Sequence, residues 1–357
     1  MPVSKKELEK HIISFINEEK RPILLWGASH AGQICYRWLD FYGKKDQVVA
    51  FLDSNAALEG KKINDIPIMT PEKGMQAHRD AVVIISTQFH AEVYKRAKAY
   101  IADIYFFENR LPAYYNGETH PLPTEELLNL YQNDPKSRLR LEICDLLIQY
   151  NFSAVFPYKV TEEIPLFHEY WDEEDLTLDR YSAFTLIDCG AFIGDTIEFI
   201  HKKYPTKEQY YYAFEPSPTI YQTLLQTVER LGIQEKVQTF NAGVSDASGK
   251  AYFTEDSFAS RVGEGEETIE LLRLDDLSIS PKGKLCIKMD IEGSEMAALQ
   301  GAAQLIKTYK PELAICVYHK YDDIYDIPAY LRSIVPEYRF LLRGGPHMEC
   351  YASVDRF

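Results

Sequence analysis

The sequence has little of what marks secreted, membrane-spanning or nucleic-acid-binding proteins. Residues 1–20 are charged throughout and contain no long apolar run, so neither a signal peptide nor a membrane span is predicted there. Lysine and arginine total 39 against 54 aspartates and glutamates, a net charge of −15. This negative excess argues against a surface for nucleic acid or an anionic membrane. We therefore expect a cytoplasmic protein with no nucleic-acid partner and no membrane span.

Cysteine is also sparse and shows no useful spacing. The six cysteines are scattered, without a C-x-x-C pair or the density of a disulfide framework, so reduced thiols are expected. No internal repeat or low-complexity tract interrupts the chain. At 357 residues the chain is too long for one ordinary core, and about two domains are predicted.

Residues 1–110 carry the pattern of a small parallel-sheet domain. An apolar run leads into the turn GASHAG, an amphipathic segment follows, and a second apolar run ends at Asp53. Gly27, Ser29 and Gly32 occupy the three positions of G-x-G-x-x-G, and Asp53 stands where a ribose-binding carboxylate belongs. Ser29 replaces the glycine that lets a pyrophosphate approach the backbone. The turn therefore predicts either a nucleotide site or a degenerate turn that serves packing.

The rest of this domain reads as a Rossmann-like sheet of about four strands that ends near Phe107. It resembles the N-terminal domain of some sugar-modifying enzymes, which implies binding of the nucleotide part of an activated sugar. Packing or pairing of the chain as a homodimer is the alternative. Residues 111–181 read as a helical connector, with helices over Glu125–Tyr131 and Lys136–Tyr150. Tyr170, near its end, is interpreted as part of a lid or of the packing between domains.

Residues 182–357 supply strand patterns in regular succession, separated by helical patterns. The last two strand patterns are joined by GGPHM, which is too short for a crossover helix and predicts a hairpin. An α/β fold follows, with a Rossmann-like seven-stranded sheet that is mostly parallel and ends in an antiparallel hairpin. The predicted strands lie at residues 184–189, 209–214, 237–244, 284–291, 312–319, 338–343 and 349–354.

A glycine turn follows the first of these strands in TLIDCGAFIGDT. Strand, tight turn and helix place backbone N–H groups and the positive end of a helix dipole beside a ligand. Glu215 ends the next strand, where a carboxylate can accept the hydroxyls of a ribose. The site predicted here holds an adenosine-like ligand. Its candidate residues are Asp188, Gly190, Gly194, Asp195, Thr196 and Glu215.

An acidic loop follows the fourth strand in KMDIEGSE. Asp290, Glu292 and Glu295 crowd into one strand end and helix start, and His319 ends the neighbouring strand. Carboxylates at a helix start can be mere caps, and a lone strand-end histidine is often structural. However, ligands bind at the carboxyl ends of strands in open α/β sheets, so their convergence predicts catalysis.

These motifs together resemble the FkbM family of methyltransferases. The strings that carry the resemblance are DCGAFIGDT, YAFEPSP, NAGVSD, IKMDIEGSEMAALQGA and CVYHK. The resemblance implies an S-adenosyl-L-methionine-dependent methyltransferase whose glycine turn lies against the cofactor. Asn241 and Gly243 would then lie near the adenine, and Asp290 beside the donor methyl. A hydroxyl of a saccharide, glycolipid precursor or natural-product scaffold is the acceptor that the family suggests.

Methyl transfer requires alignment of the acceptor and removal of its proton. An imidazole near its ordinary pKa can act as that base, so His319 is predicted to be the general base or an acceptor-orienting group. Glu292 and Glu295 are expected to support the acceptor site. No metal-ligand set is predicted, although oxygen ligands at this loop would suit Mg²⁺ as an optional activator. Two alternatives are a non-catalytic binding protein and an NAD-dependent enzyme that uses Gly27 to Gly32.

Overall fold

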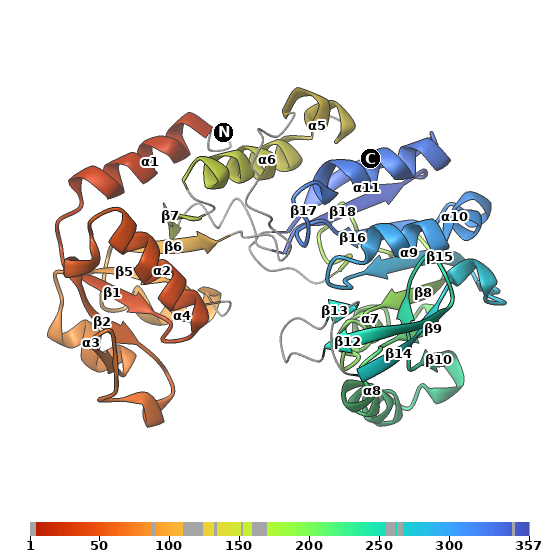
Figure 1. Ribbon diagram of the computed structural model, residues 1–357, viewed down its shortest axis with the longest axis horizontal. Helices are drawn as coiled ribbons and strands as arrows, with labels where there is room; N and C mark the ends of the chain where they lie inside the picture. Colours follow the sequence, from red (N-terminus) through yellow and green to blue (C-terminus); the bar gives the residue numbers. More distant parts are fainter. Residues whose placement is uncertain are drawn as a thin grey trace. The chain divides into compact units, whose positions relative to one another are not determined.

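The computed structural model describes residues 5–87, 90–109, 124–131, 134–150, 153–158, 170–254, 261–262, 267–344 and 347–356. The chain divides into two compact units (Figure 1). Unit 1 comprises Met1–Leu111, Thr119–Leu122 and Arg138–Phe167, and unit 2 comprises Pro112–Glu118, Pro123–Ser137 and His168–Phe357. The connector expected at residues 111–181 is thus shared between the units, and the division falls within the helix α6 (Pro135–Gln149).

Unit 1 is built on a seven-stranded sheet in the order β3-β4-β2-β1-β5-β6-β7. The pairs formed by β4, β2, β1, β5 and β6 are parallel, whereas β3 and β7 pair antiparallel with β4 and β6. The expected four strands are therefore too few, because β3 and β4 add two strands between β2 and β5 in the chain, and β7 comes from the segment expected to be a connector. The strands are β1 (Ile23–Trp26), β2 (Val48–Leu52), β3 (Lys62–Ile63), β4 (Ile66–Met69), β5 (Val82–Ile85), β6 (Ile104–Asn109) and β7 (Ser153–Pro157).

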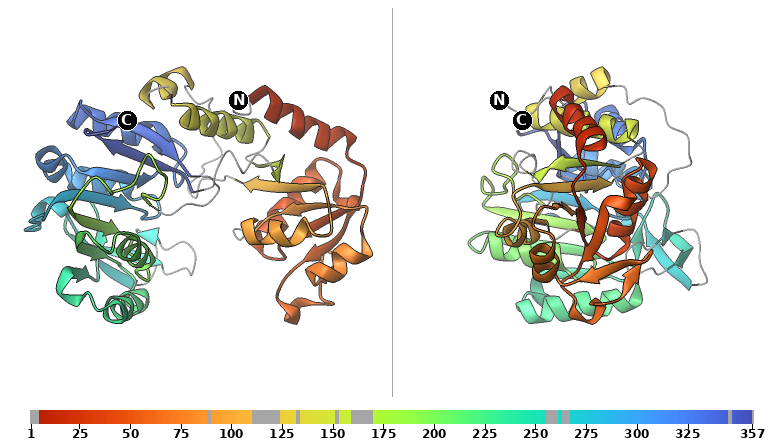
Figure 2. Two further views of the ribbon diagram at one scale, coloured as in Figure 1. Left: turned by 180° about the vertical axis from the view of Figure 1, so that it is seen from behind. Right: turned by 90° about the vertical axis from the view of Figure 1, so that its left-hand side faces the viewer.

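Helices cover both faces of this sheet because successive strand residues point to opposite sides. Leu24 packs in one buried cluster with residues of α3 (Pro71–Ala77) and α4 (His90–Ala97). Leu25 packs in the opposite cluster with residues of α1 (Lys5–Glu18) and α2 (His30–Phe41). Figure 2 gives two further views of the ribbon around this sheet. The strands are buried on both faces, which explains their continuous apolar runs.

Unit 2 contains a second seven-stranded sheet, in the order β10-β9-β8-β15-β16-β18-β17. Its first five strands run parallel, and β18 pairs antiparallel with both β16 and β17. The predicted mostly parallel sheet with a terminal hairpin is therefore confirmed. The strands are β8 (Ala183–Cys189), β9 (Glu208–Phe214), β10 (Val237–Phe240), β15 (Lys284–Met289), β16 (Glu312–Cys316), β17 (Arg339–Arg343) and β18 (Glu349–Ser353).

The helices of unit 2 begin and end at recognisable signals. In α8 (Pro218–Leu231), the Ser217 hydroxyl accepts from the Ile220 N–H, and Gly232 ends the helix in the left-handed conformation. Neither α8 nor any other helix among the described residues has the length and apolarity to cross a membrane. The other helices wholly in this unit are α5 (Thr124–Leu130), α7 (Asp195–Lys203), α9 (Glu295–Gly301), α10 (Ala303–Tyr309) and α11 (Asp323–Ile334).

The third predicted strand of unit 2, residues 237–244, is two strands. β10 ends at Phe240 and belongs to the large sheet, whereas β11 (Gly243–Val244) joins a small sheet in the order β11-β14-β12-β13. The remaining strands of the small sheet are β12 (Gly249–Thr254), β13 (Arg261–Val262) and β14 (Glu267–Leu272).

The order of the large sheet fixes where a ligand can bind. From β8 the chain adds β9 and β10 on one side, and then returns to place β15 on the other side of β8. Figure 1 shows β9, β8 and β15 as consecutive strands of this sheet. A crevice opens at such a reversal, outside the carboxyl ends of the strands. The glycine turn and the acidic loop follow β8 and β15 directly.

Candidate active site

The glycine turn after β8 is packed closely against the end of β15. Gly190 and Gly194 have φ values of +82° and +84°, in the left-handed region that favours glycine. A Cβ atom at Gly190 would lie 2.0 Å from the carbonyl oxygen of Asp290. Glycine is therefore required at position 190 both by the backbone conformation and by the approach of the acidic loop.

A buried ion pair stabilises this turn. Asp188 Oδ1 lies 3.1 Å from Lys288 Nζ, and both side chains are almost fully buried. Lys288 also donates to the carbonyl oxygen of Gly190 over 2.7 Å. Burial raises the pKa of Asp188 to about 6 although Lys288 acts to lower it, so the carboxyl is largely ionised at neutral pH. Lys288 was not among the predicted site residues, although a lysine inside an apolar strand is itself a signal.

Glu215 follows β9 and closes the turn from the other side. Its Oε2 accepts from the Phe192 N–H over 3.0 Å, and its Oε1 accepts from the Ser217 N–H over 2.9 Å. Each carboxylate oxygen can accept a second hydrogen bond, so Glu215 retains the capacity to hold two hydroxyls. Burial raises the pKa of Glu215 to about 7, against the lowering effect of the two backbone N–H groups.

The predicted adenine-side residues have structural contacts of their own. The Asn241 amide donates to the carbonyl oxygens of Glu215 and Pro216 over 2.9 and 3.0 Å, so it ties the ends of β9 and β10 together. A Cβ atom at Gly243 would lie 3.0 Å from the Leu271 side chain, where β11 pairs with β14.

Two predicted residues lie in the first turn of α7. Asp195 is exposed, and its Oδ1 accepts from the Thr196 N–H over 3.0 Å. Thr196 is buried. Beside them, Phe192 and Ile193 are 44% and 38% exposed. They supply apolar surface at the mouth of the glycine turn.

Asp290 receives two phenolic hydrogen bonds at the carboxyl edge. Tyr318 donates to Oδ1 over 3.1 Å and Tyr170 donates to Oδ2 over 3.2 Å. Burial would raise the pKa of Asp290, but Lys288 and then His319 lower it, so the group is ionised. Tyr318 was not predicted as a site residue. Tyr170 was interpreted as part of a lid or of interdomain packing, and the structure places it within unit 2 at Asp290.

His319 lies behind the acidic loop and is only 1% exposed. Its Nδ1 is 2.9 Å from Glu295 Oε1, and its Nε2 is 3.5 Å from both Asp290 Oδ1 and Glu292 Oε2. Burial would lower the pKa of His319, but the three carboxylates, Glu295 foremost, raise it to about 9. The expectation of an imidazole near its ordinary pKa is therefore wrong, because the carboxylates favour its protonated form.

The structure separates the two glutamates that were predicted together. Glu292 is partly exposed and adopts a φ of +54° at the tip of the loop. Glu295 is fully buried, and its Oε1 accepts from the Ile291 N–H over 2.9 Å. Glu295 therefore orients His319 and the loop from within, whereas Glu292 and Asp290 face the accessible side.

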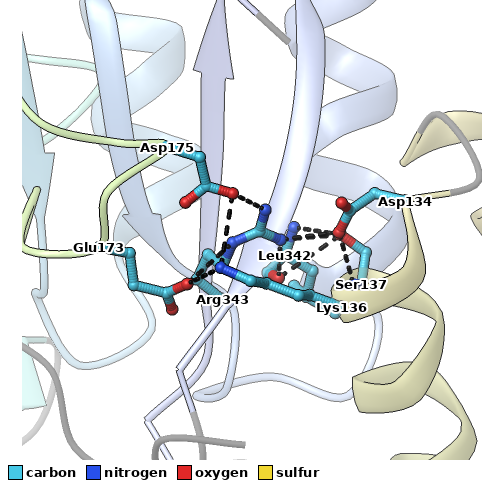
Figure 3. Close-up of polar contacts among 7 residues, drawn as sticks. All are labelled: Asp134, Lys136, Ser137, Glu173, Asp175, Leu342 and Arg343. Carbon is cyan, nitrogen blue, oxygen red and sulfur yellow. Dashed lines mark hydrogen bonds and ion pairs between the residues drawn. The ribbon is translucent and has the colours of Figure 1, made fainter. Parts of the chain in front are cut away.

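Figure 3 shows the buried Arg343 between the carboxylates of Glu173 and Asp175 and that of Asp134. Arg343, at the end of β17, has no exposed side-chain surface. Its guanidinium lies 3.3 Å from Glu173 and 2.5 Å from Asp175. On the other side it lies 2.8 Å from Asp134, at the start of α6. The segment after Tyr170, which carries Glu173 and Asp175, is thereby fixed to the sheet of unit 2, since a buried guanidinium has lost its hydration and needs carboxylates around it to offset that loss.

The turn after β1 in unit 1 is also tight. A Cβ atom at Gly32 would lie 1.8 Å from the Gly27 carbonyl oxygen. Asp53 Oδ2 accepts from the Ala28 N–H over 3.2 Å, and Ser29 is exposed at the start of α2. Packing of the turn accounts for both glycines, and Asp53 closes the turn with a hydrogen bond of its own.

Comparison with known proteins agrees with the fold of unit 2. Residues 188–342 match the family model described as the methyltransferase FkbM domain. A methyltransferase FkbM from Methylobacillus flagellatus KT has 21% identity and a TM-score of 0.59, over 93% of this chain and 89% of that one. A SAM-dependent methyltransferase from Aquifex aeolicus has 12% identity and a TM-score of 0.28, over 48% and 81% of the two chains. No curated protein matches the chain.

The family model spans the strands and loops that form the site, from Asp188 to the end of β17. Residues 188–342 accordingly resemble an FkbM methyltransferase domain, and the match covers less than half of the chain. The solved FkbM structure shares the fold with this chain.

Proposed function

We propose that the chain transfers the methyl group of S-adenosyl-L-methionine to a hydroxyl oxygen. The proposed acceptor is a saccharide, a glycolipid precursor or a natural-product scaffold. The observation that carries the proposal is the meeting of two features at one sheet edge, namely the glycine turn with Glu215 and the cluster of Asp290, Glu292 and His319.

The residues of the glycine turn suit the proposed donor. Glu215 is held in place by two backbone N–H groups and can still accept two hydroxyls, as binding of a ribose requires. The exposed Phe192 and Ile193 offer apolar surface for the adenosine. Asp188 is fully buried and paired with Lys288, so we assign it to shaping the turn.

On the acceptor side, the predicted residues differ in how far their side chains are exposed. Asp290 and Glu292 are about 30% exposed, whereas His319 and Glu295 are almost fully buried. We therefore assign contact with the acceptor to Asp290 and Glu292, and we assign positioning of these two carboxylates to His319. Of the two roles that the sequence left open for His319, general base and orienting group, this favours the second.

The chemistry requires little covalent work from the protein. The bound cofactor supplies an electrophilic methyl group on a sulfonium, which leaves S-adenosylhomocysteine once the methyl–oxygen bond forms. Asp290 orients the acceptor hydroxyl. The proton of that hydroxyl passes to the carboxylates of the acidic loop and on to solvent. Tyr170 and Tyr318 fix the direction of the Asp290 carboxylate.

A methyl-transfer assay tests this proposal. Chain and methyl-labelled S-adenosyl-L-methionine are incubated with panels of sugars, nucleotide sugars, glycolipid precursors and polyketide alcohols, and labelled methyl ether is measured. We expect Asp290→Asn to lower turnover by about a hundredfold or more while cofactor affinity stays within about threefold. Glu229→Gln, an exposed change on α8, is the matched control. Full turnover in both Asp290→Asn and His319→Gln, each folded and cofactor-loaded, would disprove the site.

The alternatives make different predictions in calorimetry. A non-catalytic binding protein would bind S-adenosyl-L-methionine but transfer no label to any acceptor. An NAD-dependent enzyme would bind NAD through unit 1 and not bind S-adenosyl-L-methionine at all. For unit 1 we propose that Gly27, Ser29, Gly32 and Asp53 line a site for the nucleotide part of an activated sugar. Sugar nucleotides that do not bind, together with a dimer that dissociates on deletion of unit 1, would instead assign unit 1 to pairing of the chain.

A further inference from the structure

We infer that Asp290, Glu292 and His319 form a binding site for a divalent transition-metal ion. Each residue offers one ligand atom, and the three atoms lie within 4.8 Å of one another. Two side chains come from the loop after β15 and one comes from the loop after β16, which ends at Cys316, so these adjacent parallel strands bring the two loops together. Among the described residues, this is the group of acidic, histidine and cysteine side chains that satisfies this spacing.

The distances fit a shared cation better than a hydrogen bond. His319 Nε2 lies 3.5 Å from one oxygen of Asp290 and 3.5 Å from one oxygen of Glu292. A charged N–H donating to a carboxylate would approach to about 2.7–2.9 Å. Two ligands about 2.1 Å from one metal, at a tetrahedral angle, stand about 3.4 Å apart. The two separations measured from Nε2 are therefore those that two ligands of a common ion would show.

The orientation of His319 is independent support. The ring is 1% exposed, and neither of its nitrogens meets the geometry of a hydrogen bond among the described residues. Its Nδ1 faces Glu295 Oε1 at 2.9 Å, and that oxygen is anchored by the Ile291 N–H. A carboxylate on the far nitrogen of a ligating histidine fixes its tautomer and directs the free nitrogen at the metal. Glu295 has the position of that orienting carboxylate.

Three carboxylates lie around the imidazole of His319. They belong to Asp290, Glu292 and Glu295, at 2.9 to 3.5 Å from its ring nitrogens. Lys288, two residues before Asp290 on the chain, has its ammonium against Asp188 and the Gly190 carbonyl oxygen. A divalent ion between Asp290, Glu292 and Nε2 of His319 would offset part of this negative charge.

The ligand types indicate which ion to expect. Imidazole suits zinc and other transition metals, and carboxylate suits manganese, whereas magnesium prefers an octahedron of oxygens with several waters. Zn²⁺ or Mn²⁺ thus fits the set better than Mg²⁺, which the sequence alone had left open. With three protein ligands a coordination position stays open, and a hydroxyl oxygen of the acceptor would occupy it. This last role rests on the proposed function, whereas metal binding does not.

Metal titration of the ligand-free chain tests the inference. After EDTA treatment and removal of the chelator, Mn²⁺ binding is followed by electron paramagnetic resonance and Zn²⁺ binding by calorimetry. We expect one equivalent to bind, and expect Asp290→Asn, Glu292→Gln and His319→Gln each to weaken binding by about tenfold or more. Asp290 and Glu292 are partly exposed, so their variants keep the test decisive if His319→Gln fails to fold.

A matched control distinguishes metal binding at the proposed site from nonspecific binding to surface carboxylates. Glu229→Gln removes an exposed carboxylate on α8 and should leave the single equivalent unchanged. Absence of binding at millimolar Mn²⁺ and Zn²⁺ would overturn the inference, as would equal weakening by Asp290→Asn and Glu229→Gln. Cofactor binding is measured separately, so a chain that binds the cofactor but no metal refutes the metal site alone. A chain that binds metal but not S-adenosyl-L-methionine refutes the methyltransferase proposal alone.

Discussion

Replacement of Lys288 by methionine is predicted to destabilise the glycine turn after β8, where Lys288 pairs with Asp188. The change removes the ammonium 3.1 Å from the fully buried Asp188 carboxylate, together with its hydrogen bond to the Gly190 carbonyl oxygen. Even with Lys288 present, burial raises the pKa of Asp188 from 3.8 to about 6. That rise corresponds to about 3 kcal/mol of unfavourable burial of the charged form above pH 6, which is absent below pH 3.8. Without the lysine the penalty grows, and breaking a buried pair typically costs about 3–5 kcal/mol.

Hydrogen exchange resolved by peptide measures this cost locally. In the Lys288→Met variant at pH 8, amides of β8 and β15 should exchange at least about a hundredfold faster, after correction for intrinsic rates. The increase should shrink at pH 5, because protonation of Asp188 removes the unpaired charge. The double variant Asp188→Asn/Lys288→Met should return within about 1 kcal/mol of wild type, since it buries neither charge. Exchange within about threefold of wild type in Lys288→Met, or no recovery in the double variant, would refute this reasoning.

Three further outcomes follow from particular contacts. Because burial raises the pKa of Glu215 to about 7, S-adenosylhomocysteine should bind about tenfold more weakly at pH 6 than at pH 8 in calorimetry, and Glu215→Gln should abolish that dependence. Gly190→Ala should lower the melting temperature far more than Gly232→Ala, which has a similar backbone but nothing within 4 Å of an added Cβ. Arg343→Met should lower the free energy of unfolding, measured with urea, by about 3–5 kcal/mol. Lys136→Met, which removes a half-exposed partner of Glu173, should lower it by less than about 1 kcal/mol.

The parts of the site that the sequence predicted are those written in short, contiguous motifs. The glycine turn after Asp188 and the acidic loop at Asp290 each combine an apolar strand, a turn and a helix start within a few residues. The periodicity of apolar residues and the residue types typical of turns suffice to find such features. The terminal hairpin was predictable for the same reason, because its connection is too short for any crossover.

The parts that the sequence did not predict depend on contacts between distant segments. Tyr170 and Asp290 are 120 residues apart, and Lys288 reaches the carbonyl of a residue 98 positions earlier. No local pattern reports such a pairing. The charge state of His319 was missed for a related reason, because its pKa is set by three carboxylates that only the fold brings around it. In unit 1, β7 was overlooked because it pairs with β6 after two intervening helices.

Ultraviolet cross-linking of methyl-labelled S-adenosyl-L-methionine, followed by peptide mapping, tests the central claim most directly. Under the proposed function, the cofactor would lie at the carboxyl ends of β8, β9 and β15, beside Glu215. Label should therefore appear in peptides that contain residues 188–196 or 212–218, and excess S-adenosylhomocysteine should prevent it. Label confined to the Gly27 turn of unit 1, or absent from both turns under conditions where the cofactor binds, would contradict the account.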